Sequence, residues 1–149
     1  MPKIKLKKQE QYEFEYKTTI QVTQINYGGH LGNDALVSIT HQARVNLLKE
    51  LGFTELDLGD GETGIIMADL AVNYLGEAFM FDELTVYSHV DEISSHSFRV
   101  FHNITKEDKS IALAETGIIA FNYKDHMISE IPEIFINKLN KKTGTIYEV

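Results

Sequence analysis

The chain has 149 residues, no cysteine, 43% hydrophobic residues and a formal net charge of -8, which fits one domain, 1–149, and excludes disulfides and thiolate sites. The acidic balance argues against a general nucleic-acid-binding role, although a local basic patch for an anionic ligand stays open. No apolar run is long enough to span a membrane and no signal peptide is expected, so we expect a cytoplasmic protein that does not bind membranes.

The first elements are a lysine-rich stretch, a strand and a long helix. Residues 3–11 are charged, and we expect them to fray or to form a sheet edge. Apolar residues then alternate at period two over residues 12–22, which predicts a half-buried strand. Over residues 34–51 they recur every three or four positions and predict a helix of about five turns. Asn33 is the expected N-cap, and Gly52 the left-handed residue that ends the helix.

The second half of the chain keeps a period of two after a polar loop. Strands are predicted at residues 64–74, 82–94, 95–104 and 111–123. Their short connections favour antiparallel neighbours, and Pro132 opens a short segment that we expect to be helical. One long helix with five or six strands predicts a two-layer α+β domain in which the sheet curls around the helix.

Three segments together form a recognisable pattern across residues 14–135. They are INYGGHLGNDALVSITHQARVNLLKELGF (25–53), VNYLGEAFMFDELTVYSHV (72–90) and the late sheet that ends before Ile131-Pro132. The pattern resembles the hotdog-fold acyl-CoA thioesterases of the 4-hydroxybenzoyl-CoA thioesterase-like superfamily. The resemblance implies a hotdog fold and hydrolysis of acyl-CoA, or of an acyl group on a phosphopantetheine arm. It also implies a homodimer or homotetramer, with active sites at subunit interfaces near the start of the central helix.

No motif of a bound cofactor accompanies this pattern. The run GDGETG (59–64) precedes a strand, so it is not a dinucleotide-binding fingerprint, and it lacks the spacing of a calcium loop. A Gly-x-Ser-x-Gly nucleophile elbow is missing, and the histidines outside the glycine turn lack metal-ligand spacing. We therefore expect no metal and no cofactor.

The Gly-Gly-His turn is the place where we expect the thioester to bind. Backbone N–H groups at a helix start lack partners and carry the positive end of the dipole, so they can stabilise an oxyanion. Gly28, Gly29 and His30 lie where such donors are expected, and glycine lets a substrate approach the backbone closely. Tyr27 and Leu31 flank them, and we expect these two with both glycines to contact the substrate.

The group that activates water is less clearly marked. Asn26 stands where many members of the family have an aspartate, and an amide can orient water but cannot act as a base. The other catalytic candidates are His30, Asp34 in the first helical turn, and Asp69, which a partner subunit could bring to the site. Simpler roles are a turn residue for Asn26, a cap or packing group for His30 and a surface acid for Asp34. For Asp69 they are an ion pair with Arg99 or a lysine, or a place at an exposed edge.

Two other functions stay open on the same pattern. Asn26 favours a non-catalytic acyl-CoA-binding or regulatory module that kept the pocket and lost the base. A hydratase or dehydratase acting on acyl thioesters would need a histidine and a carboxylate facing each other across the interface. How the phosphates of CoA would be held is also open, because few basic residues surround the glycines; Lys17, Arg44 and Lys49 are weak candidates.

Overall fold

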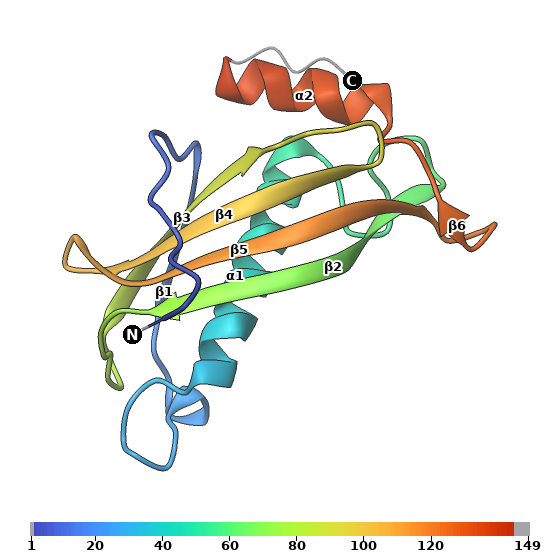
Figure 1. Ribbon diagram of the computed structural model, residues 1–149. Coiled ribbons are helices and arrows are strands. Elements are labelled where there is room, and N and C mark those ends of the chain that lie inside the picture. The colour runs from blue at the N-terminus through green and yellow to red at the C-terminus, as the bar shows by residue number, and fades with distance from the viewer. Residues whose placement is uncertain (1, 145–149) are drawn as a thin grey trace.

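The computed structural model describes residues 2–144 and shows a sheet curled around one long helix (Figure 1). The elements in chain order are β1 (Phe14–Thr19), η1 (Val22–Gln24), α1 (Asn33–Leu51), β2 (Thr63–Tyr74), β3 (Glu83–Asp91), β4 (Ser97–Lys106), β5 (Lys109–Asn122), β6 (Met127–Ile128) and α2 (Glu133–Thr143). The expected two-layer α+β architecture is confirmed. Within residues 2–144, no helix combines the length and apolar character needed to cross a membrane.

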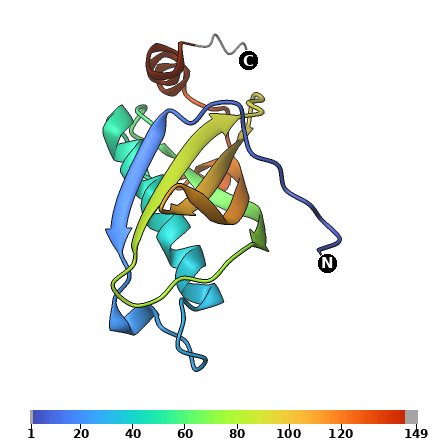
Figure 2. The same ribbon diagram turned by 90° about the vertical axis from the view of Figure 1, so that its left-hand side faces the viewer.

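The sheet is antiparallel throughout and follows the order β1-β3-β4-β5-β2, with β6 paired to β5. The helix α1 packs against one face, called the inner face here, and the opposite outer face is turned away from it (Figures 1 and 2). Among residues 2–144, β2 lies at one end of this order and β1 at the other, so each has one neighbouring strand along it. The Tyr74 hydroxyl at the end of β2 donates to the Asn33 carbonyl, so the start of α1 lies near the end of β2, where the candidate site is found.

The boundaries differ from the predicted ones in ways that local hydrogen bonds explain. Asn33 is the first helical residue and Gly32 is the N-cap, so the predicted cap at Asn33 is wrong by one residue. Gly52 ends α1 with φ +93°, as predicted. The first strand is shorter than predicted because residues 22–24 form a 3₁₀ turn, in which the Gln24 side chain accepts the N–H of Gln21 at 2.8 Å. The two-residue strand β6 was not predicted.

The core contains several polar groups on α1 and on the inner face of the sheet, and His102 Nε2 is one buried atom among residues 2–144 that has no hydrogen-bond partner. Arg44 is only 3% exposed, and its Nε donates to Glu55 at 2.8 Å. His102 is fully buried, with Nδ1 2.7 Å from the Ser88 hydroxyl. Burial, aided by the nearby charge of Arg44, lowers the pKa of His102 to about 3, so this imidazole is neutral at physiological pH. Other buried polar residues, among them His89, Thr116 and Asn122, lie in the strands, and the large buried side chains around them are mostly apolar.

The lysine-rich segment 3–11, called the strap, neither frays nor forms a sheet edge. It crosses the outer face of the sheet (Figures 1 and 2). The Asn73 side chain on β2 holds it, because Asn73 Nδ2 donates to the Ile4 carbonyl at 2.9 Å and the Leu6 N–H donates to Asn73 Oδ1 at 2.7 Å. The Asn73 amide explains why the strap is held on the outer face. Alternation along a strand predicts the two faces of a sheet, but it does not predict which other segment crosses one of them.

Candidate active site

Asn26 closes the Gly-Gly-His turn by accepting hydrogen bonds from three backbone N–H groups. Asn26 Oδ1 accepts the N–H of Gly28 at 2.9 Å and the N–H of His30 at 3.2 Å. The Asn26 carbonyl accepts the N–H of Gly29 at 3.1 Å, and Gly29 adopts φ +87°, a conformation that favours glycine. The expectation that these three amides hold a substrate oxygen is therefore wrong, because Asn26 occupies them as the centre of a turn.

The open donors lie a few residues further along, in the first turn of α1. Gly32 caps the helix without any side-chain hydrogen bond, and the Leu36 N–H is the first to reach back, to the Gly32 carbonyl at 3.0 Å. The N–H groups of Asn33, Asp34 and Ala35 precede that bond, so they have no acceptor inside the helix. Within the part of the chain that the structure describes, the first turn of α1 thus presents uncapped donors at the positive end of the dipole.

Asp34 and Asn26, two of the predicted site residues, both have side-chain atoms close to Gly32. A Cβ placed on Gly32 would lie 2.6 Å from Asp34 Oδ1 and 3.5 Å from the Asn26 Cβ. The carboxylate of Asp34 and the side chain of Asn26 therefore lie on the same side of the chain, next to the uncapped amides. Only glycine at position 32 leaves Asp34 where it is.

Tyr74 joins this group from the last residue of β2. Its hydroxyl donates to the Asn33 carbonyl at 3.1 Å. Burial raises the pKa of Tyr74, and the negative charge of Asp34 raises it further, so the phenol and the carboxylate lie near each other. The sequence analysis did not place Tyr74 in the site. The sequence predicts Tyr74 as the last residue of a strand, but it does not show that this strand ends beside the start of the helix.

His30 lies beside the loop between β2 and β3. Its Nε2 is 3.6 Å from Glu77 Oε1, and its Nδ1 is 3.5 Å from the Asn26 amide nitrogen. The ring meets Phe79 edge-on, with centroids 6.1 Å apart. His30 thus connects Asn26 to the neighbouring loop through long contacts, and Glu77 and Phe79 are site residues that the sequence did not reveal.

The rim of the site is apolar and exposed. Tyr27 is fully exposed at the tip of the glycine turn, and the Leu31 N–H donates to the Ala78 carbonyl at 2.8 Å, which joins the two loops. Phe79 and Phe81 are also exposed, and Phe81 adopts φ +74°, a strained conformation for a bulky residue. Phe79 contacts His30, whereas the Phe81 N–H donates to the Ile20 carbonyl at 2.9 Å and so lies beside the end of β1.

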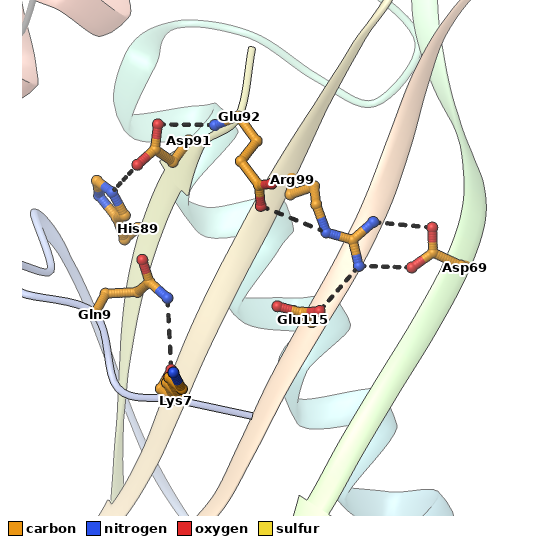
Figure 3. Close-up of polar contacts among 8 residues, drawn as sticks. All are labelled: Lys7, Gln9, Asp69, His89, Asp91, Glu92, Arg99 and Glu115. Carbon is orange, nitrogen blue, oxygen red and sulfur yellow. Dashed lines mark hydrogen bonds and ion pairs between the residues drawn. The ribbon is translucent and has the colours of Figure 1, made fainter. Parts of the chain in front are cut away.

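Asp69 lies away from these residues, on the outer face of the sheet (Figure 3). Arg99 on β4 holds both of its carboxylate oxygens, at 3.0 and 2.7 Å. These hydrogen bonds lower the pKa of Asp69. The pair lies over Gly117 of β5, where any Cβ would collide with both side chains. The alternative expectation for Asp69, an ion pair with Arg99, is confirmed, and within this chain Asp69 does not meet Asn26 or Asp34.

The comparisons with known proteins agree with this architecture. The family model of the thioesterase-like superfamily matches residues 20–139. No curated protein sequence is significantly similar to the chain. Solved structures similar to it include a 1,4-dihydroxy-2-naphthoyl-CoA thioesterase from Synechocystis, at 15% identity and TM-score 0.76 over 85% of this chain and 94% of that one. A hypothetical protein from Staphylococcus aureus in complex with CoA has 16% identity and TM-score 0.81 over 91% and 87%. These likenesses confirm the hotdog fold.

Proposed function

Because the chain belongs to the thioesterase-like superfamily, we propose that it hydrolyses acyl-CoA by water attack at the start of α1. The expected class of enzyme, a thioester hydrolase, is confirmed at the level of the family. The observation that carries the proposed site is the uncapped first turn of α1, with side-chain atoms of Asp34 and Asn26 close to the same side of Gly32. CoA as the carrier is supported by the CoA complex of the similar Staphylococcus aureus protein.

The proposed reaction assigns each group one task. The N–H groups of Asn33 and Ala35 donate to the thioester oxygen and stabilise the negative charge that develops on it. The Asp34 carboxylate accepts a proton from water as the water oxygen bonds to the carbonyl carbon. The C–S bond then breaks, and the CoA thiolate takes up a proton. Asn26, whose Oδ1 holds the turn, presents its amide nitrogen toward His30, 3.5 Å away.

The remaining predicted residues surround this centre. We assign His30 a positioning role, because its ring lies between the Asn26 amide and Glu77. Tyr27 and Leu31 are assigned to the walls that contact the acyl or pantetheine part, together with the turn glycines. Asp69 keeps a structural role, since both of its oxygens are bound by Arg99.

We also propose a homodimer in which β2 pairs with β2 of a second copy. The strand β2 has β5 as its only long neighbour along the sheet among residues 2–144, and residues 67–70 are exposed on it, including Met67 and Leu70. An exposed apolar edge strand is a template for pairing. Such pairing would place the start of α1 at a subunit interface. Light scattering tests it: Leu70→Glu should shift the mass toward the monomer, and an unchanged mass contradicts the proposed interface.

A second function is favoured by one observation. The side-chain oxygen of Asn26, Oδ1, already accepts the N–H groups of Gly28 and His30, so Asn26 cannot act in place of the aspartate that many relatives carry. If Asp34 is not a sufficient base, the chain is a non-catalytic acyl-CoA-binding module. Ligand-induced thermal stabilisation without turnover would identify that module.

The deciding experiment measures free thiol released from short, long and aromatic acyl-CoAs. Wild type should release thiol from at least one class, Asp34→Asn should release it far more slowly, and Asp125→Asn is the matched control, an exposed aspartate in the turn after β5. No thiol from any of these substrates would contradict the hydrolase. Water addition to enoyl-CoA, or its loss from 3-hydroxyacyl-CoA, would instead indicate a hydratase or dehydratase.

A further inference from the structure

The strap carries four of the chain's 14 basic residues within six positions, in a protein of net charge -8. These residues are Lys3, Lys5, Lys7 and Lys8, and all four are exposed. Within residues 2–144 none of them forms an ion pair, whereas Arg99, Lys106 and Lys142 each contact a carboxylate. The strap is thus a local basic patch on an otherwise acidic molecule, and its charge is free for a ligand.

The basic residues that the sequence suggested for the phosphates of CoA are placed elsewhere. Arg44 is buried and bonded to Glu55. Lys17 lies 3.5 Å from Glu15. Lys49 lies in the last turn of α1, about 24 Å from the first helical residue at 1.5 Å per residue. Arg44 is thus unavailable to a ligand, Lys49 lies far from the start of α1, and Lys17 already has a carboxylate neighbour.

The strap reaches the same end of β2 as the candidate site. Asn73 holds the backbone of Ile4 and Leu6, and the next residue, Tyr74, contacts the Asn33 carbonyl at the start of α1. Two consecutive residues of β2 therefore connect the strap on the outer face with the helix start on the inner face. In Figure 1 the N-terminal end of the strap lies beside the end of β2, and Figure 2 shows the same relation from the side.

We propose that Lys3 and Lys5, supported by Lys7, bind the phosphate groups of the nucleotide end of CoA. This inference rests on the proposed function, in which the thioester lies at the start of α1. The pantetheine arm would pass the end of β2, and the diphosphate and 3′-phosphate would meet the ammonium groups. Lysine suits this task as a flexible point charge that binds phosphate.

A free CoA thioester fits this patch better than an acidic carrier protein. A compact ligand meets only the local positive potential of the strap. A carrier with a broad acidic surface would also face the rest of a chain whose net charge is -8. The small anionic ligand is therefore the occupant that the charge distribution favours.

The test is calorimetric binding of CoA and of dephospho-CoA to wild type and to Lys3→Glu/Lys5→Glu. Two lost exposed contacts and two added repulsions should together weaken CoA binding about tenfold, because each exposed charge pair contributes only modestly. The loss should be smaller for dephospho-CoA, which lacks the 3′-phosphate, and it should shrink as salt is added. Hydrolysis of an acyl-pantetheine thioester, which has no phosphate, should be unchanged.

The control variant is Lys138→Glu/Lys141→Glu on α2, which changes the net charge equally at the other end of the molecule (Figure 1). Equal losses in both variants would overturn the proposal, because they would reflect total charge. Unchanged CoA binding, or a loss confined to an acyl carrier protein, would overturn it as well. The proposed function fails separately, through absent thiol release: a chain that binds CoA through the strap without turnover would keep this inference and lose the hydrolase.

Discussion

Asp34 and Asp69 are both exposed aspartates, yet they stand in opposite situations. Both oxygens of Asp69 accept hydrogen bonds from Arg99, which is itself in contact with Glu115 at 3.3 Å. Among residues 2–144, Asp34 has no ion pair; it lies beside Gly32, near the Tyr74 phenol. A carboxylate whose lone pairs are taken stabilises the sheet, whereas one with open lone pairs can accept a proton. Occupancy by partners, rather than residue type, separates the structural carboxylate of Asp69 from Asp34, the carboxylate that we propose as the base.

The largest effect should follow from neutralising the open carboxylate. Asp34→Asn should lower kcat/KM by about 10²–10⁴-fold, the usual contribution of a general base, because the amide cannot accept the proton of water. Asp69→Asn should leave kcat/KM within a factor of about three, since its neighbours lie on the outer face and surface substitutions cause small effects. Steady-state thiol release measures both. Equal losses in the two variants would contradict the distinction.

A smaller effect is expected from displacing the same carboxylate without removing it. Gly32→Ala places a Cβ 2.6 Å from Asp34 Oδ1, so the carboxylate must move. A displacement of about 1 Å can cost about 10²-fold in rate, and we expect a loss of that order with the fold intact. Gly76→Ala is the control, because its Cβ would meet nothing nearer than 3.6 Å. Circular dichroism checks the fold, and full activity in Gly32→Ala would argue against Asp34 as the base.

A moderate effect is expected from removing the Tyr74 hydroxyl, which joins the end of β2 to the start of α1. Tyr74→Phe removes the hydrogen bond to the Asn33 carbonyl. One such bond contributes about 0.5–1.5 kcal/mol, so kcat/KM should fall about two- to tenfold. Tyr87→Phe, on the middle of β3, is the matched control. If both variants retain full activity, the end of β2 does not position the amides of α1.

The fold could be predicted from the sequence because the spacing of apolar residues differs between strands and helices. Alternation at period two located the four long strands from residue 63 onward to within a few residues, and the three-to-four spacing located α1. The strap was not predictable, since the Asn73 side chain that holds it lies about 70 positions away in the chain. Contacts between such distant segments leave no periodic trace in either of them.

The candidate site could be proposed from the sequence as a region but not in its contacts. Glycines before a helix point to this region, yet the amides of Gly28 and Gly29 are bonded to Asn26, which depends on side-chain conformation. The open donors lie instead in residues 33–35. Tyr74 and Glu77 come from another loop and strand end, so their part in the site follows only from the packing of β2 beside α1.

The smallest effect should come from the paired carboxylate, and it should depend on pH. The Arg99 hydrogen bonds lower the pKa of Asp69, so its ionised form stabilises the folded state above the unfolded-chain pKa of about 3.9. That contribution is lost as the pH falls through the lowered pKa of the folded state. Asp69 is 53% exposed, so at pH 7 we expect Asp69→Asn to cost only about 0.2–1 kcal/mol of unfolding free energy. The difference from wild type, measured by urea unfolding, should therefore shrink as the pH falls below about 3.9, and Asp125→Asn should show no such trend. A difference that stays constant as the pH falls would mean that Asp69 acts through its shape rather than its charge.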